Sequence, residues 1–206
     1  MDLDAFLPLI LPYVPGCPDA TAKDHAIKAG RIFCSKTRCW AYETAIVLTQ
    51  PGVTTYALDI DDGEMERVRL LSASMDGRPL TVLDARDGRS LAREGGYSCD
   101  SVWLDNGTDV GFLPAPTVGG AKLVLQIAVK PALTATEWPD ELAEYLDDVA
   151  HGAISSLTAM PRVAWRDTDT AQYHEARFRE RIAAVGFNST FGYASTPAKR
   201  LRSRFL

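Results

Sequence analysis

Residues 19–39 read DATAKDHAIKAGRIFCSKTRC, and this stretch decides the class of fold. Four of its residues recur at intervals of four, three and four: Ala22, Ala26, Ala29 and Phe33. That spacing puts them on one face of an α-helix, and Ile27 and Cys34 broaden the apolar stripe. We therefore expect an amphipathic helix over 19–39 that packs against other helices. Thr21 and Asp24 have the spacing of a variant capping box at its start.

Two further helical patterns lie near the end of the chain. The first begins near Pro139, because proline lacks the N–H that would be unpaired at a first helical position. Its apolar face contains Leu142, Tyr145, Leu146, Val149, Ala153, Ile154 and Leu157. The second follows the polar run 167–170, which supplies an N-terminal cap. Its apolar face contains Ala171, His174, Phe178, Ile182 and Val185. Gly186 is expected to end it.

Between these helical segments the pattern changes to short runs of β-prone residues. The predicted strands are Tyr42–Thr49, Val53–Ile60, Met65–Leu71, Leu80–Asp84, Val102–Asp105, Val110–Leu113 and Leu123–Val129. Asp76-Gly77 and Asn106-Gly107 favour tight hairpins because these residue types tolerate positive φ, and Pro51-Gly52 marks another turn. We predict antiparallel meanders here. Residues 86–100 have little apolar periodicity and several glycines, so we expect a mobile loop there.

These patterns predict an α+β fold. We expect a small helical bundle, made of one N-terminal and two C-terminal helices, that carries an antiparallel β insertion and ends in an extended C-terminal tail. The bundle is predicted to comprise residues 1–41 and 131–190, the β-rich insertion residues 42–130, and the C-terminal docking tail residues 191–206. A chain of 206 residues with 46% hydrophobic content can bury a sizeable core, and this composition excludes wholesale disorder.

The formal net charge of −5 conceals an uneven distribution. Residues 1–161 hold 13 Lys and Arg against 23 Asp and Glu, whereas residues 162–206 hold 9 against 4. The body is therefore acidic, with net charge −10, and the C-terminal region is basic, with net charge +5. Binding to nucleic acid or to an anionic membrane would require a local cationic patch on this acidic chain. The apolar segment 6–12 is too short for a bilayer span and lacks a basic flank, so we expect no membrane association and no secretory signal.

The last residues of the chain concentrate the positive charge. They alternate cations with apolar side chains, and we predict that they form a docking site: Lys199, Arg200, Leu201, Arg202, Ser203, Arg204, Phe205 and Leu206. An acidic groove with apolar pockets could order such a segment as an added strand or an extended clip. Arginine–phosphate pairing with nucleic acid is the alternative. The acidic remainder of the chain and the few aromatic residues in the tail favour a protein partner.

No sequence motif indicates catalysis or cofactor binding. The sequence has no Gly-rich phosphate loop and no dinucleotide-binding fingerprint. Cys34 and Cys39 lack a second close pair or a histidine at the right spacing, so we expect free thiols, no metal site and no cofactor. Asp147 and His151 stand at i, i+4 and could share a metal or a proton, although a surface pair is the simpler interpretation. His174 is expected to be packed.

Three stretches resemble a known family of phage proteins. They are FLPLILPYVPGCP at residues 6–18, FCSKTRCW at residues 33–40 and HGAISSLTAMPRVAW at residues 151–165. The order of features is also similar: helix, β insertion with Tyr56 and Leu58, Trp138-Pro-Asp, helix, Met-Pro, helix and tail. On these residues the chain resembles the head-to-tail adaptor (connector) proteins of tailed bacteriophages, related to tail tubular protein A. The resemblance covers most of the chain.

This resemblance implies a structural virion protein, not an enzyme, that forms a ring beneath the portal and joins the DNA-filled head to the tail. The implied partners are the portal protein, bound through Lys199–Leu206, other copies of the chain in a dodecameric ring, and a downstream tail or nozzle protein. DNA would pass through the lumen without sequence-specific binding. The implied location is the head–tail junction of the virion, after assembly in the host cytoplasm.

Two other interpretations stay open on the sequence. Another tail component, such as a fibre-attachment or tail-completion protein, would bind tail partners and ignore the portal. A small metal-dependent hydrolase using His151 and nearby acids would bind a metal and lose activity on His151→Ala.

Overall fold

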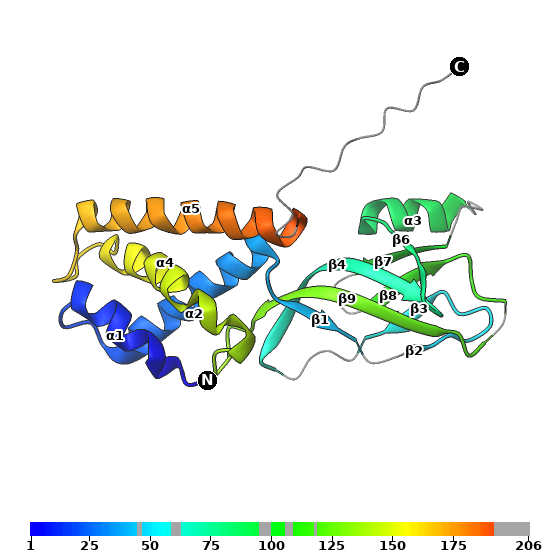
Figure 1. Ribbon diagram of the computed structural model, residues 1–206, viewed down its shortest axis with the longest axis horizontal. Helices are drawn as coiled ribbons and strands as arrows, with labels where there is room; N and C mark the ends of the chain where they lie inside the picture. The colour runs from blue at the N-terminus through cyan, green and yellow to red at the C-terminus, as the bar shows by residue number, and fades with distance from the viewer. Residues whose placement is uncertain (45–46, 59–62, 95–99, 106–108, 118, 192–206) are drawn as a thin grey trace, which may run out of the picture.

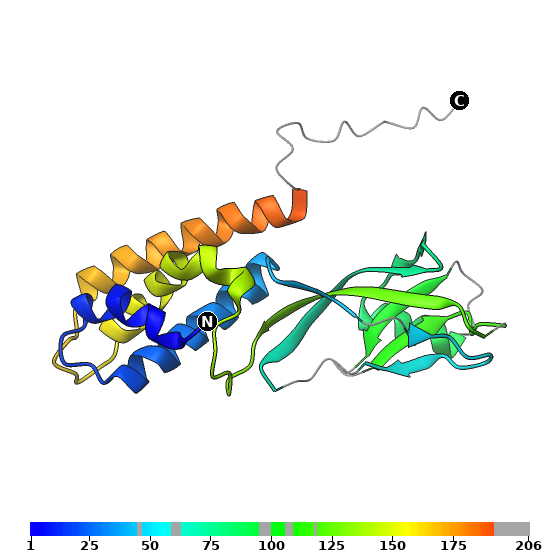
Figure 2. The ribbon, with the colours of Figure 1, turned by 60° about the horizontal axis from the view of Figure 1, so that its bottom comes forward.

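The structure, a computed structural model, describes residues 1–44, 47–58, 63–94, 100–105, 109–117 and 119–191. It confirms the predicted mixed α+β class. The molecule is elongated, with four of the helices at one end and the strands at the other (Figure 1). These helices are α1 (Leu7–Ile10), α2 (Asp19–Thr37), α4 (Leu146–Thr158) and α5 (Thr168–Phe191). The turned view in Figure 2 shows the same two parts, a helical part and a β part, joined end to end.

Helix α2 follows the predicted apolar stripe. The stripe is confirmed because its members are buried: Ala22, Ala26, Ala29 and Phe33. The predicted capping box is wrong, because the helix begins two residues earlier than Thr21 and no side chain caps it. Instead, the carbonyl of Pro18 accepts hydrogen bonds from the N–H groups of Thr21 and Ala22. The helix ends at Thr37, where Arg38 takes the left-handed backbone conformation with φ 56°.

Short turns precede α2, where the sequence indicated only one N-terminal helix. They are η1 (Leu3–Phe6), α1 and η2 (Leu11–Tyr13). Pro8 and Pro12 each lie in the first two positions of a turn, where the missing N–H costs little. Three side chains of this region are fully buried in the same core as α2: Phe6, Ile10 and Val14. The apolar start of the chain is therefore part of the helical core.

The two predicted C-terminal helices, α4 and α5, are present. Turn η3 (Asp140–Tyr145) leads into α4, which packs against α1, α2 and α5. The predicted apolar faces of both helices are buried or half-buried. Asp167 caps α5 as predicted, because its carboxylate accepts hydrogen bonds from the N–H groups of Asp169 at 3.0 Å and Thr170 at 3.2 Å.

Gly186 does not end α5, contrary to the prediction. The helix continues to Phe191. A Cβ at Gly186 would lie 3.7 Å from the Lys36 carbonyl oxygen and from the Thr37 Cα, so this glycine lies against the end of α2. A methyl group at this position would make only ordinary van der Waals contacts.

The β part contains two sheets. Their strands are β1 (Ala41–Glu43), β2 (Val47–Leu48), β3 (Thr55–Ala57), β4 (Met65–Met75), β5 (Arg78–Pro79), β6 (Thr81–Val82), β7 (Ser101–Asp105), β8 (Asp109–Leu113) and β9 (Lys122–Pro131). One sheet has the order β1-β9-β4-β5, with β2 also on β9, and the other has the order β3-β8-β7-β6. The pairing is antiparallel except between β6 and β7. The predicted antiparallel pairing is confirmed, and β4–β5 and β7–β8 pair as neighbours in sequence. The simple meander order is wrong for β9, the last strand, which pairs with the early strands β1, β2 and β4.

Two of the predicted turns are confirmed. Asp76 and Gly77 both have positive φ, 47° and 77°, in the tight turn between β4 and β5. Gly52 has φ 75° in the turn that follows Pro51. Such backbone conformations are the ones that glycine and Asp or Asn tolerate best. Asn106-Gly107 lies outside the described residues.

Residues 85–94 form helix α3 (Ala85–Glu94), so the prediction of a mobile loop over 86–100 is wrong for this part. Gly88 lets α3 lie directly on the indole of Trp103 in β7, because a Cβ there would be 2.3 Å from the Trp103 Cδ2. Ala85 and Leu91, three residues before and after Gly88, are half-buried on the same side of the helix. Residues 95–99 lie outside the described part of the chain.

A cluster of charged groups joins the helical part to the β part. The Arg31 guanidinium on α2 donates hydrogen bonds to both carboxylate oxygens of Glu66 on β4, at 2.7 and 2.9 Å. It also donates to the carbonyl of Pro131 at the end of β9, at 2.7 Å. The hydrogen bond from Arg31 lowers the pKa of Glu66. Charge-assisted, bidentate bonds of this kind are among the stronger ones in proteins, so they fix the orientation of α2 on the sheet.

Candidate functional site

The docking site predicted from the sequence, Lys199–Leu206, lies outside the described residues. The structure does place the helix that precedes it. Close to the end of α5, the Ser189 hydroxyl donates a hydrogen bond to the carbonyl of Thr37 at the end of α2. The chain therefore leaves α5 near the point where α2 leads into the β part.

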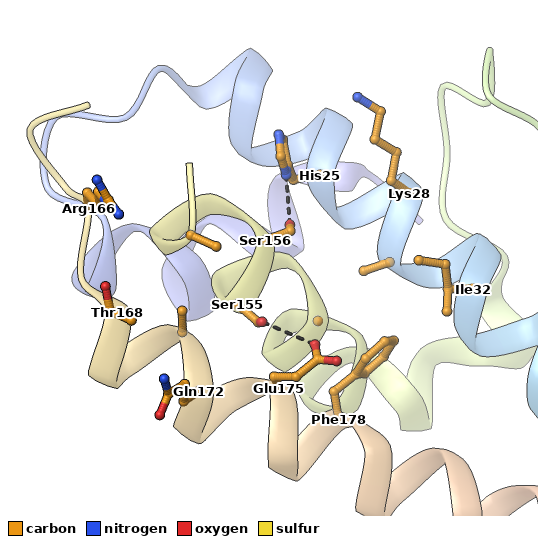
Figure 3. Close-up of a pocket in the computed structure, with 14 residues that line it drawn as sticks. His25, Lys28, Ile32, Ser155, Ser156, Arg166, Thr168, Gln172, Glu175 and Phe178 are labelled. Atoms are coloured by element: carbon orange, nitrogen blue, oxygen red, sulfur yellow. Dashed lines mark hydrogen bonds between the residues drawn. The ribbon is translucent and has the colours of Figure 1, made fainter. Parts of the chain in front are cut away.

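An apolar groove opens on the helical part, between α2 and α5 (Figure 3). Its volume is about 680 Å³. Its floor, on α4 and the residue that follows it, consists of small residues: Gly152, Ser155, Ser156 and Ala159. Ile32 lies on the α2 wall and is 52% exposed, and Phe178 lies on the α5 wall. The groove is therefore a surface that can receive side chains from another molecule.

The small floor residues explain why this groove exists. A Cβ at Gly152 would lie 2.8 Å from the Phe178 ring and 3.0 Å from the Ala29 Cβ. Helix α4 thus approaches both neighbouring helices closely, and its short side chains leave the space between the walls unfilled. The spacing of residues 152, 155, 156 and 159 is helical and could have indicated this floor in the sequence. The floor was not among the sites predicted from the sequence.

Two hydrogen bonds brace the walls of the groove against its floor (Figure 3). Ser155 Oγ donates to Glu175 Oε2 at 3.2 Å and so links α4 to α5. His25 Nδ1 and Ser156 Oγ are 2.7 Å apart and link α2 to α4. Burial lowers the pKa of His25, and the charge of Lys28 lowers it further. The His25 ring is therefore neutral at pH 7 and serves as a structural link.

A pair of histidines joins α4 to α5. The Nδ1 atoms of His151 and His174 are 2.7 Å apart, so one ring donates its proton to the unprotonated nitrogen of the other. His174 is 2% exposed and packs edge-on against the Tyr13 ring, which confirms that it is packed. Asp147 has no hydrogen bond or ion pair to His151 among the described residues and acts on it through charge alone.

The residues considered for metal binding do not come together in the described part of the chain. No group of three or more His, Cys, Asp or Glu side chains there is arranged to hold a metal ion. Cys17, Cys34 and Cys39 are free thiols. The interaction with the Cys39 thiol, together with burial, raises the pKa of Cys34 well above its usual value. Cys34 is therefore a protonated, buried side chain rather than a thiolate ligand.

Acidification is expected to destabilise the fold through these histidines. Burial lowers the pKa values of His25, His151 and His174 below the unfolded value of about 6.5. Below that pH the unfolded chain binds more protons than the folded chain. The free energy of unfolding should thus be fully retained above about pH 6.5 and should fall as the pH drops below it.

Urea unfolding at about pH 7.5, 6.5 and 5.5 measures this dependence, in a range where most carboxylates stay ionised. The matched variant His25→Asn keeps a side chain that can hydrogen bond to Ser156 but removes one titrating ring. Its stability should depend less steeply on pH. Equal stability of the natural chain at all three pH values would contradict the role of the buried rings.

Comparison with known proteins identifies the class of the molecule. The model of one protein family, described as SU10 adaptor protein, matches residues 18–201. This is a class of structural phage proteins that act as adaptors between head and tail. The chain belongs to the SU10 adaptor protein family. A search of curated proteins found no match.

The family confirms the resemblance found in the sequence and places the protein among the structural components of a phage virion. A structural adaptor family points away from an enzyme, and so away from the hydrolase interpretation based on His151. No helix in the described residues is both long enough and apolar enough to cross a membrane.

Proposed function

We propose that this adaptor forms a ring that docks on the portal and connects the head to the tail. The family match over residues 18–201 is the observation that carries this proposal. Its proposed partners are the portal, further copies of the chain in a dodecameric ring, and a downstream tail or nozzle protein. The protein would assemble in the host cytoplasm and then remain at the head–tail junction.

The C-terminal segment is the proposed portal-binding element. Its eight last residues hold four cations and three large apolar side chains in alternation: Lys199, Arg200, Leu201, Arg202, Ser203, Arg204, Phe205 and Leu206. They follow a helix whose end is tied to α2 by the Ser189–Thr37 hydrogen bond. A segment that combines cationic and apolar side chains suits a complementary groove on a second protein. The helical part provides the fixed base from which it reaches.

The acidic body suits the passage of DNA. Residues 1–161 have a net charge of −10, and a wall of that sign does not release counterions from the duplex by neutralising its phosphates. We propose that DNA passes through the lumen of the ring without sequence-specific binding.

Removal of residues 197–206 is expected to abolish stable docking on the portal. We expect the truncated chain to need at least about tenfold more protein for half-saturation of purified portal rings, because it loses cationic and apolar contacts together. Two matched variants separate these contributions. One reverses Lys199, Arg200, Arg202 and Arg204 to Glu, and the other replaces Leu201, Phe205 and Leu206 by Ser.

Sedimentation of the adaptor with portal rings, at low and high salt, measures the binding. The charge-reversed variant should lose most of its salt-sensitive binding, whereas the serine variant should keep the salt sensitivity at lower affinity. Full binding by the truncated chain would contradict the assignment of these residues. A natural chain that binds other tail proteins and ignores the portal would instead identify a different tail component.

A further inference from the structure

The groove on the helical part continues over the exposed face of α2. Lys28 and Ile32 line both the groove and a neighbouring hollow of about 360 Å³. The ionisable side chains that line this second hollow are all cationic: Lys28, Arg31, Lys36 and Lys130. Lys28 and Lys36 are exposed, and they stand one turn before and one turn after Ile32. We name Lys28, Ile32 and Lys36 the cationic stripe.

This basic, apolar surface is unusual for a chain whose first 161 residues have net charge −10. Arg31 and Lys130 are already paired with Glu66, and Lys28 has only an exposed ion pair with Asp24 on its own helix. Lys36 has no ion pair among the described residues. Exposed pairs within one helix contribute little and exchange readily. Two lysines beside an exposed isoleucine are therefore available to an acidic partner.

An acidic surface of matching dimensions lies elsewhere on the same chain. Glu141 and Glu144 in η3 and Asp147 at the start of α4 are exposed, and none has an ion pair within the described ranges. Residues three apart eclipse one another in a 3-10 helix, so Glu141 and Glu144 stand on one side of η3, and Asp147 follows in the first turn of α4. None of the three lines the groove or the cationic hollow. We name these three residues the acidic row.

The two surfaces agree in length as well as in sign. The span from Lys28 to Lys36 is eight residues of α-helix, or about 12 Å. The span from Glu141 to Asp147 combines 3-10 and α-helical residues and is roughly 11 Å. Charges at both ends of the cationic stripe can therefore meet carboxylates at both ends of the acidic row, with Ile32 between them.

We propose that the acidic row of one copy docks on the cationic stripe and groove of the next copy. This inference rests on the proposed ring and names the surfaces that would join its subunits. Because the two surfaces are different parts of the chain, the contact is heterologous, and such contacts close into rings when the rotation between copies fits. Lys28 and Arg166 line the groove, and their positive charges would repel the chain's own basic tail.

A charge swap on the full chain tests this contact. The stripe variant is Lys28→Glu with Lys36→Glu, and the row variant is Glu141→Lys with Glu144→Lys. The combined variant contains all four changes and so restores complementarity with the signs exchanged. The matched control, Arg78→Glu with Lys122→Glu, makes the same charge change as the stripe variant at exposed sites of the β part.

Binding to portal rings is measured as a function of adaptor concentration. The natural chain and the control should bind cooperatively, because each bound copy offers a surface to the next. The stripe and row variants should lose that cooperativity and need at least about tenfold more protein for full occupancy, whereas the combined variant should regain it. Circular dichroism and urea unfolding show that each variant is folded.

The proposed contact is overturned if the stripe and row variants bind portal rings as the natural chain does. It is also overturned if the combined variant binds no more cooperatively than the stripe or row variant. Either result would leave portal docking intact. Failure of the natural chain to bind the portal at all would instead contradict the proposed function. The contact is then judged from sedimentation of the free chain at high concentration. The same pattern of loss and recovery supports the contact there, and no difference between the variants overturns it.

Discussion

Replacement of Trp138 by alanine is expected to lower the free energy of unfolding by about 3–5 kcal/mol. Trp138 is 1% exposed, and its ring meets the Phe6 ring edge-on with centroids 5.0 Å apart. Its Nε1 donates a hydrogen bond to the carbonyl of Leu142 at 3.1 Å. A Cβ at Gly30 would lie only 2.5 Å from the indole. The side chain thus fills the space between the N-terminal turns, α2 and η3, and its loss leaves a cavity.

Two further variants identify the source of this effect. Trp138→Phe keeps much of the apolar volume and loses the hydrogen bond to Leu142, so it should cost less than the alanine variant. Gly30→Ala should be destabilising alone, because α2 would have to move away from the indole, but much less so in the Trp138→Ala background. Urea unfolding measures the natural chain and the four variants. Additive effects of the two changes would contradict direct packing of Gly30 on Trp138.

The helices could be predicted from the sequence because their own residues carry the signal. The apolar residues of α2 and α5 recur at helical spacing in the sequence. The cap at Asp167 is also local, because its side chain accepts hydrogen bonds from N–H groups only two and three residues away. All the residues that determine such a feature lie within one short segment of the sequence. The turn at Asp76-Gly77 could be predicted for the same reason.

The features that were missed depend on residues distant in the sequence. Helix α3 takes its apolar contact from Trp103, and the pairing of β9 with β1 and β4 joins the two ends of the β region. Gly186 has the residue type of a helix end, but α5 continues past it beside the end of α2. Hydrophobic periodicity within one segment carries no information about such partners.

The candidate sites also differ in whether their residues are close together in the sequence. The C-terminal residues Lys199–Leu206 could be selected because alternation of cations and apolar side chains is visible in the sequence alone. The groove could not be selected by that route, since it requires α2, α4 and α5 to lie at fixed distances. The contact between His151 and His174 also exists only once α5 folds back on α4.

Replacement of Trp103 is expected to cause the second large loss of stability, in the β part. Its side chain is 5% exposed and lies between two glycines. Cβ atoms at Gly88 on α3 and Gly111 on β8 would be 2.3 and 2.2 Å from the indole. Trp103→Ala should therefore cost about 3–5 kcal/mol and release α3 from the sheet. The indole Nε1 has no hydrogen-bond partner in the described structure, so the loss comes from packing and not from a broken hydrogen bond.

A double-mutant cycle with Gly111→Ala tests that packing directly. Gly111→Ala alone should be strongly destabilising, because the added methyl group would occupy the space of the indole. In the Trp103→Ala background the same methyl group enters the vacated space, so its cost should fall by about 1–3 kcal/mol. Hydrogen exchange of residues 85–94 reports whether α3 stays folded. Protection of those amides in Trp103→Ala equal to that in the natural chain would show that α3 is held by other contacts.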